Sequence, residues 1–275
     1  MIKKVTAGDQ SPEEEAEMSF LDHLEELRWV IIKALISIVI FAAVVYIFHD
    51  LFFETVMFAH TKDSFPTYRF FCNIGACFGP PEFEIIQTQM GEQFFTALKV
   101  SFWVGLIISF PYVFHQIWSF IKPGLYPNER KAARGVVFVC SSLFLIGILF
   151  GYFIMAPFAI KFLAGYTVGL STVNNSTSLS SFVNYLTMFT IPTGILFQLP
   201  VLVYFLAKVG LLTADFMRQY RKHAFVIILI LAAIITPPDI VTQFLIGVPV
   251  YFLYEISINI AKRTERKRQK ELDNL

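Results

Sequence analysis

The chain has little charge for its length. Asp, Glu, Lys and Arg make up 16% of its 275 residues, whereas a soluble domain of this size has about a quarter. Hydrophobic residues make up 56%, including 31 Phe. This composition is typical of a multi-pass membrane protein and argues against a soluble domain. The net charge of +1 gives no indication of a nucleic-acid partner, and we expect none.

The chain has only three cysteines, too few for a disulfide framework. Cys72 and Cys77 share one loop as CNIGAC, and this spacing permits a bridge without requiring one. The loop, about 49–93, mixes prolines and aromatics, which favours an ordered cap over a linker. Cys140 lies inside an apolar run, and we interpret it as a small packing residue.

Motifs of catalysis or metal binding are missing. There is no glycine-rich phosphate loop, no H-E-x-x-H and no C-x-x-C. The histidines lie in different segments without ligand spacing: His23, His49, His60, His115 and His223. We therefore expect no metal, no cofactor and no enzymatic activity, since a membrane-embedded enzyme would need a catalytic dyad that the sequence does not show.

Six apolar runs predict an all-α polytopic protein with six transmembrane helices. Their approximate bounds are 29–48, 94–118, 135–156, 182–207, 223–235 and 240–257. We expect Pro111 to break the second span and Pro157 to stop the third. Pro192 and Pro200 predict that the fourth is kinked and packed against its neighbours.

The last two spans are expected to be short. The run 223–235 has 13 residues, about 20 Å of helix against a hydrocarbon core of about 30 Å. We predict two short spans that turn at Pro237–Pro238, with the bilayer thinned around them. A buried re-entrant hairpin is the alternative.

The segments outside the spans are polar. We expect residues 1–17 to form a disordered tail. We expect no cleavable signal peptide, because the first apolar run is long enough to span the membrane. The six-helix domain then covers 18–261, and 262–275 is a basic tail. Before the first span, Met18, Leu21, Leu24 and Leu27 form one apolar stripe, which is typical of an interfacial helix.

Basic residues indicate the orientation in the membrane. Four lie within 1–33, four at 122–134, four at 208–222 and six at 262–270, which makes 18 of the 22. The rest are Lys62, Arg69, Lys99 and Lys161. Positive charge beside spans marks the cytoplasmic side, so we expect both termini to be cytoplasmic and the CNIGAC loop to be outside, where a disulfide could persist.

Several carboxylates and amides lie at membrane boundaries, where ionisable groups are candidates for function. Glu26 precedes the first span and Glu129 the third, so both should lie at the cytoplasmic surface. Two such acids could bind a cation, and guanidinium pairs with carboxylate better than ammonium does. The alternative is a pair of solvated charges bridged to Arg28 and Arg130. The other candidates are Gln198, Asp239, Gln243 and Glu255.

Five motifs resemble the TatC family, the receptor subunit of the twin-arginine protein translocase. They are SFLDHLEELR at 19–28, FPYVFHQIWSFIKPGLYPNER at 110–130, GILFQLPV at 194–201, ITPPDIVTQ at 235–243 and LYE at 253–255. The resemblance runs from Met18 to Glu255. It implies a cup-shaped six-helix protein of the bacterial cytoplasmic membrane that recognises twin-arginine signal peptides of folded cargo. It also implies TatA/TatB-like partners, other TatC copies, and transport driven by the proton-motive force.

The resemblance also implies roles for particular residues. By position, Glu26 and Glu129 contact the twin arginines, Phe120 is a further candidate contact, and Leu27 and Arg28 belong to the first motif. Residues expected to shape the second motif's loop are Pro123, Leu125, Tyr126 and Arg130. Asp239 and Gln243 match positions tied to assembly or transport.

One position departs from the family pattern. Gln198 stands where the family often has a glutamate within the fourth span. Gln keeps its hydrogen bonds but cannot ionise, so a role that needs a protonatable group is in doubt here. A role as a polar group that hydrates or thins the membrane is still open to Gln198. The alternative function is a secondary transporter of a small cation or proton, with Glu26, Gln198 and Asp239 along its path. Such folds usually contain internal repeats, and the two halves show none.

Overall fold

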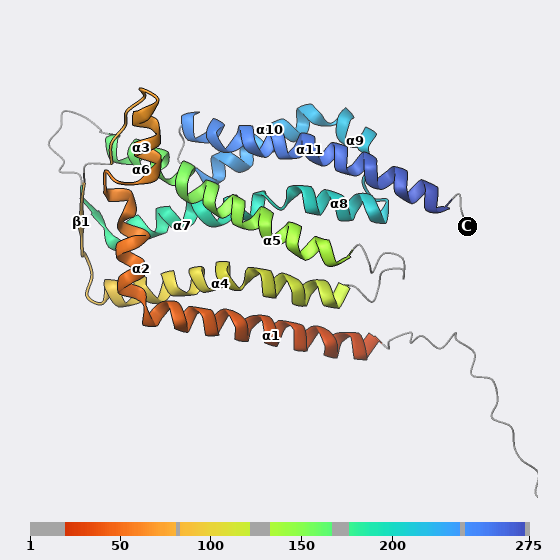
Figure 1. The fold of residues 1–275 in the computed structure, drawn as a ribbon, viewed down its shortest axis with the longest axis horizontal. Helices are drawn as coiled ribbons and strands as arrows, with labels where there is room; N and C mark the ends of the chain where they lie inside the picture. The colour runs from red at the N-terminus through yellow and green to blue at the C-terminus, as the bar shows by residue number, and fades with distance from the viewer. Residues whose placement is uncertain (1–19, 81–82, 122–132, 167–175, 237–239, 273–275) are drawn as a thin grey trace, which may run out of the picture.

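The computed structural model describes residues 20–80, 83–121, 133–166, 176–236 and 240–272, and most of them are helical. In chain order the elements are α1 (Phe20–Ile47), α2 (His49–Thr55), η1 (Met57–Thr61), α3 (Pro66–Asn73), β1 (Glu84–Ile86), α4 (Glu92–Ile121), α5 (Ala133–Phe150), η3 (Gly151–Met155), α6 (Ala156–Gly165), β2 (Ser176–Ser178), α7 (Leu179–Leu196), α8 (Leu199–Val209), α9 (Ala214–Gln219), α10 (Arg221–Ile235) and α11 (Ile240–Leu272) (Figure 1).

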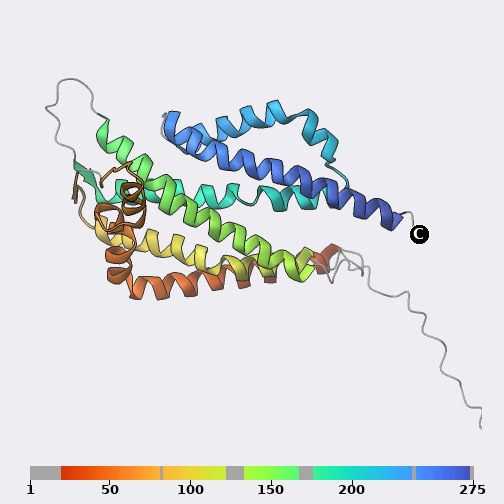
Figure 2. The ribbon, with the colours of Figure 1, turned by 45° about the horizontal axis from the view of Figure 1, so that its top comes forward.

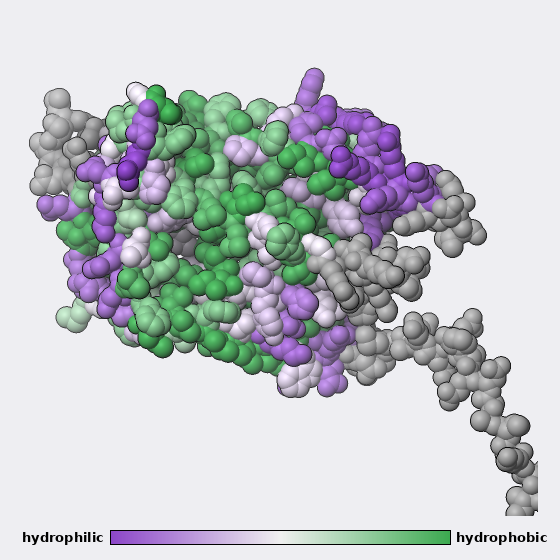
Figure 3. All heavy atoms as spheres, in the orientation of Figure 1, coloured by the Kyte–Doolittle hydropathy of each residue, from purple (hydrophilic) through white to green (hydrophobic). Residues whose placement is uncertain are grey.

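Within the described ranges, five helical segments are long and apolar enough to cross a membrane: His23–Ile47, Glu92–Ile121, Gly135–Gly165, Leu179–Val209 and Ile240–Lys270. They run roughly alongside one another, with α2, α3 and β1 at one end (Figures 1 and 2). Hydrophobic side chains cover the middle of the molecule, and polar ones gather towards its two ends (Figure 3). The prediction of an all-helical, multi-pass membrane protein is confirmed.

The two C-terminal helices differ in length. α10 has 15 residues, about 22 Å of helix, and is short as the sequence predicts. The prediction of a short last span is wrong as far as the helix is concerned, because α11 has 33 residues. The Lys, Arg, Glu and Gln residues beyond 261 are strong helix formers, so the helix continues past the end of the apolar run.

Prolines interrupt the helices less than the sequence suggests. α4 runs through Pro111 without a break, and the third long helix continues past Pro157 as α6. Both expected interruptions are therefore wrong. The kink in the fourth apolar run is confirmed. Pro192 lies inside α7, and a turn at Phe197–Gln198 precedes Pro200 in the first turn of α8.

The third long helix widens into one π-helical turn, η3, just before its proline. The N–H of Ala156 donates to the carbonyl of Gly151, which leaves the carbonyl of Tyr152 without its usual helical donor. Pro157 has no N–H, so the carbonyl of Phe153 also lacks the partner that a regular helix would supply. The two carbonyls need donors from elsewhere, because an unsatisfied backbone group at membrane depth is costly.

The loop after α1 supplies these donors and forms the expected ordered cap from α2, η1 and α3. Nε2 of the buried His60 donates to the carbonyl of Tyr152 at 3.0 Å, and the hydroxyl of Thr67 donates to the carbonyl of Phe153. In return, the hydroxyl of Tyr152 donates to the carbonyl of Val56 at 2.6 Å. The cap is therefore bonded to the turn that a proline opens.

Two further links close this end of the molecule. Cys72 and Cys77 form a disulfide within the cap. β1 pairs with β2 in parallel, which joins the first and second loops at this end. Next to the strands, the carboxylate of Glu92 accepts the N–H of Ser180 at 2.8 Å, so the starts of α4 and α7 are held together.

Two helices approach each other closely where glycine replaces a side chain. A Cβ placed on Gly147 of α5 would lie 2.8 Å from Cα of Gly194 on α7 and 2.9 Å from Cβ of Phe197. α7 carries much of the core, including the buried Phe182 and Phe189. The contact between α5 and α7 therefore depends on the absence of a side chain at residue 147.

Gly147→Ala should destabilise the protein by about 1–3 kcal/mol, because the added methyl group cannot be accommodated without separating two backbones. Gly135→Ala on the same helix is the matched control. Among the described residues, no atom lies within 4 Å of a Cβ at that position, so it should be neutral or slightly stabilising. Thermal unfolding in detergent measures both, and equal midpoints for the two variants would contradict the packing argument.

Acid should loosen the cap through His60. Burial lowers the pKa of His60 from 6.5 to about 4. Between pH 6.5 and pH 4 the unfolded chain therefore binds a proton at His60 that the folded chain does not bind. Stability is therefore intact above pH 6.5 and falls as the pH drops towards 4, by about 3 kcal/mol in full. His60→Gln, which keeps a donor and does not titrate, should remove this dependence, whereas His49→Gln should not. Unfolding midpoints between pH 7.5 and 4.5 provide the test, and an unchanged slope in His60→Gln would refute it.

Candidate functional site

The end opposite the cap brings together the start of α1 and the end of α4. The ring of His23 stacks on that of Phe120, with centroids 4.3 Å apart and planes 17° from parallel. Two residues before Phe120, the buried Trp118 packs against Phe205 of α8, with ring centroids 5.0 Å apart. The last turn of α4 thus contacts both α1 and α8, and it fixes the position of Phe120 beside the first motif.

Glu26 lies one helical turn after His23 and therefore on the same face of α1. Its side chain is half-buried. Its Oε2 atom is buried and, within the part of the chain that the structure describes, has no hydrogen-bond partner. Leu27 is half-buried and Arg28 is exposed. The alternative in which Glu26 is bridged to Arg28 is therefore not observed among the contacts of the described residues.

The other predicted residues of this site lie outside the described residues, within 122–132: Pro123, Leu125, Tyr126, Glu129 and Arg130. Asp239, predicted at the turn between the last two spans, lies within 237–239 and is also outside the described residues. The described residues that flank the first segment, Ile121 and Ala133, end α4 and begin α5. Both helix ends lie at the same end of the molecule as the start of α1 (Figure 1).

Gln198 occupies the turn between α7 and α8 and is half-buried. Its Nε2 donates to the carbonyl of Cys140 on α5 at 3.1 Å. Its own backbone carbonyl accepts the N–H groups of Val201 and Leu202, both at 3.0 Å. The amide side chain thus ties a helix break to the neighbouring helix.

The polar residues of α11 contact α10. Nε2 of Gln243 donates to the carbonyl of Leu229 at 3.0 Å. Glu255 forms an ion pair with Arg221 at 2.8 Å and accepts the hydroxyl of Tyr251 at 3.2 Å. The contacts between Gln243 and Leu229 and between Arg221 and Glu255 hold the short helix against the long one. The structure therefore does not bring Gln198 and Gln243 into one cluster, and each is bonded to a different helix.

Sequence reasoning missed the part that His23 plays, although its spacing of three from Glu26 was a usable signal. It also missed the pair of Lys99 on α4 and Asn184 on α7, whose amine and amide are hydrogen-bonded, because no local pattern links positions so far apart. Within the described ranges, no group of three His, Cys, Asp or Glu side chains is placed to hold a metal ion.

The fold and this end of the bundle define the class of the protein: an all-helical, multi-pass membrane protein with a half-buried carboxylate and aromatic rings at the end opposite its cap. A family model described as Sec-independent protein translocase protein (TatC) matches residues 22–249. The chain belongs to the TatC family, and it is a non-enzymatic transport protein.

Individual relatives agree with this assignment. The chain is 37% identical over 265 residues to the Sec-independent protein translocase protein TatC of Blattabacterium sp. subsp. Periplaneta americana. The aligned region covers 93% of this chain and 99% of the relative. It is 46% identical over 178 residues to the TatC protein of Helicobacter pylori, over 65% of this chain and 70% of the other. A crystal structure of a twin-arginine translocase receptor, TatC, matches with a TM-score of 0.70 and 32% identity, over 87% of this chain and 99% of that one.

Gln198→Glu should be tolerated better in acid than in base. A protonated carboxyl can still donate to the carbonyl of Cys140, whereas a carboxylate presents an acceptor to an acceptor. We expect Gln198→Glu to be less stable than the parent protein at pH 8 and close to it at pH 5. Gln198→Met should lose about 1 kcal/mol at both. Thermal unfolding at the two pH values distinguishes them, and a Gln198→Glu protein as stable at pH 8 as the parent would show that the donor is dispensable.

Proposed function

We propose that this chain is the signal-peptide receptor and core subunit of a twin-arginine translocase, which exports folded proteins across the bacterial cytoplasmic membrane. The observation that carries the proposal is the carboxylate of Glu26. One of its oxygens is buried without a hydrogen-bond partner among the described residues. A buried, unpaired carboxylate is costly, and a cationic ligand would remove that cost.

The ligand is the arginine pair of the signal peptide. Guanidinium binds carboxylate with two parallel hydrogen bonds, which ammonium cannot do. The second acid is Glu129, within the segment 122–132 that connects α4 to α5. The helix ends that flank this segment lie at the same end as Glu26 (Figure 1), which supports a shared site.

Residues around the two acids complete the receptor. Phe120, held by stacking on His23, offers an aromatic face to a guanidinium. Leu27 and Arg28 belong to the same turn of α1 as Glu26. Within 122–132, the residues proposed to shape the loop are Pro123, Leu125, Tyr126 and Arg130.

The chain crosses the membrane six times, with both termini in the cytoplasm. Five crossings are the long apolar segments and the sixth is α10, whose 15 residues require a locally thin bilayer. The start of α1 and the end of α11 lie at the same end of the bundle (Figure 1), which supports an even number of crossings. The basic residues, concentrated at 122–134, 208–222 and 262–270, support the orientation.

Partners assemble on this scaffold: TatA/TatB-like single-span subunits and other copies of the chain, with transport driven by the proton-motive force. Gln198, Gln243 and Asp239 are the residues we assign to assembly or transport. The alternative of a small-cation transporter, with Glu26, Gln198 and Asp239 along its path, gains no support from Gln198, because its side-chain amide is bonded to the carbonyl of Cys140.

Glu26→Gln should weaken binding of a twin-arginine signal peptide about tenfold or more, because it removes a charge-assisted hydrogen bond. Photocrosslinking from a probe in the last turn of α4 measures this, with matched peptides that carry Arg-Arg or Lys-Lys. Glu25→Gln is the control, since Glu25 is the exposed neighbour on α1. Membrane insertion should be normal in both variants. Undiminished crosslinking of the Arg-Arg peptide to Glu26→Gln, or an equal loss in Glu25→Gln, would rule out the proposed role.

A further inference from the structure

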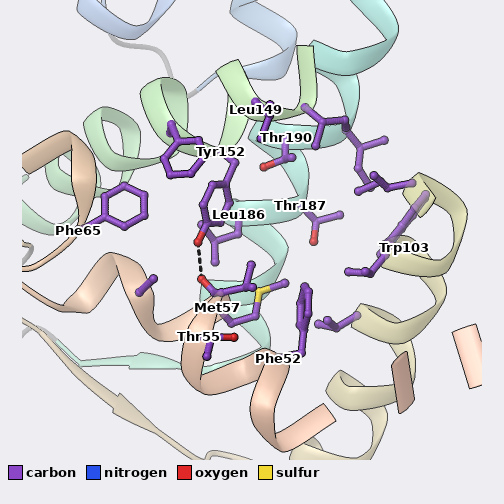
Figure 4. Close-up of a pocket in the computed structure, with 18 of the residues that line it drawn as sticks. Phe52, Thr55, Met57, Phe65, Trp103, Leu149, Tyr152, Leu186, Thr187 and Thr190 are labelled. Atoms are coloured by element: carbon purple, nitrogen blue, oxygen red, sulfur yellow. Dashed lines mark hydrogen bonds between the residues drawn. The ribbon is translucent and has the colours of Figure 1, made fainter. Parts of the chain in front are cut away.

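A partly open cavity of about 470 Å³ lies beneath the cap, bounded by α2, η1, α4, η3 and α7. Its wall is mainly hydrophobic. Phe52 from α2, Trp103 from α4 and Leu186 from α7 border it, with Tyr152 and Phe65 towards the cap (Figure 4). The cavity is separate from the proposed signal-peptide site, which is at the opposite end of the helices.

Most polar atoms of the wall already have hydrogen-bond partners within the protein. The hydroxyl of Thr55 donates to the carbonyl of Leu51 at 2.6 Å, and that of Thr187 donates to the carbonyl of Val183 at 2.8 Å. The hydroxyl of Tyr152 is bonded to the cap. Ordered water needs two to four polar partners, so this wall favours an apolar occupant.

The size and chemistry of the cavity decide between apolar occupants. An α-helix is about 10 Å across with its side chains, so the volume would hold only about one turn. An extended peptide would bury backbone N–H and C=O groups against a wall that cannot satisfy them. A single hydrocarbon chain has neither problem, and the surrounding membrane supplies such chains in excess.

A cation lies close along the chain to residues that line the cavity, although it does not line the cavity itself. Lys99 is one helical turn before Trp103 on α4, and Asn184 is one turn before Thr187 on α7, so each shares a helix face with a lining residue. Nζ of Lys99 donates to Oδ1 of Asn184. An ammonium group has three donors, so two remain for an anion. Both side chains are exposed.

We propose that this cavity binds one acyl chain of a glycerophospholipid from the leaflet on the cap side, with the lipid phosphate paired to Lys99. The apolar wall takes the chain, and the ammonium group complements the negative headgroup. The inference depends on the membrane location of the protein and is independent of the signal-peptide site.

Native mass spectrometry of the full chain in detergent, titrated with phosphatidylglycerol, tests the headgroup contact. We expect one tightly bound lipid. Lys99→Gln should weaken it about tenfold, because a charge-assisted hydrogen bond is lost. Lys161→Gln is the matched control. Lys161 contacts the carbonyl of Pro80 at 3.3 Å and lies on α6, a helix that contributes no residue to the cavity wall. Its loss should therefore leave binding unchanged.

Diacylglycerol, which has the chains but no phosphate, separates the two halves of the proposal. The parent protein should bind it about tenfold more weakly than phosphatidylglycerol, and Lys99→Gln should bind both equally. Equal binding of the two lipids by the parent protein would overturn the assignment of Lys99.

Two variants that fill the cavity test its occupant. Thr187→Phe and Ala59→Phe place a ring in it from α7 and from η1, so each can be judged without the other if one fails to fold. Each should reduce the bound lipid about tenfold while keeping a monodisperse elution profile. Lipid retained at the parent level by both variants would overturn the proposal. So would a peptide or a second copy of the chain bound in place of the lipid.

Discussion

The hydrogen bonds from His60 and Thr67 to the carbonyls of η3 are the interaction on which the cap end depends. A π-helical turn followed by Pro157 frees these carbonyls at a depth where water is scarce. Because an unsatisfied carbonyl is costly there, the cap is not an accessory laid over a finished bundle. The helix with this proline and the loop that covers it need each other.

The two ends of the molecule use polar groups in opposite ways. At the cap end, the carboxylate of Glu92 accepts N–H groups from Thr88 at 2.7 Å and from Ser180 at 2.8 Å, so its charge is compensated within the fold. At the other end, Oε2 of Glu26 has no such partner among the described residues. A carboxylate that the fold satisfies holds structure together, and one that it leaves unsatisfied is available to a ligand. This contrast supports the proposal that the signal peptide binds at the far end.

Local patterns in the sequence were enough for some features and not for others. Apolar runs located the long helices, and Pro192 with Pro200 indicated the kink between α7 and α8, because these signals lie within single segments. The prediction that Pro157 stops the third span was wrong, because the carbonyls near this proline accept hydrogen bonds from donors some 90 residues away in the chain. The stacking of His23 on Phe120 and the pairing of Lys99 with Asn184 are likewise contacts between distant segments, which periodicity cannot show. For Glu129 and Asp239 the motif remains the basis of the assignment.

The clamp between Glu92 and Ser180 has a consequence for biosynthesis. Its two halves are 88 residues apart, and the neighbouring strands are separated by a similar stretch of chain. When α4 first enters the bilayer, Ser180, the distant partner of its leading carboxylate, has not yet been made by the ribosome. The cap end must therefore stay incomplete until the next hydrophobic segment, α5 to α6, has been integrated and the start of α7 has been made. An insertase or chaperone could recognise this state.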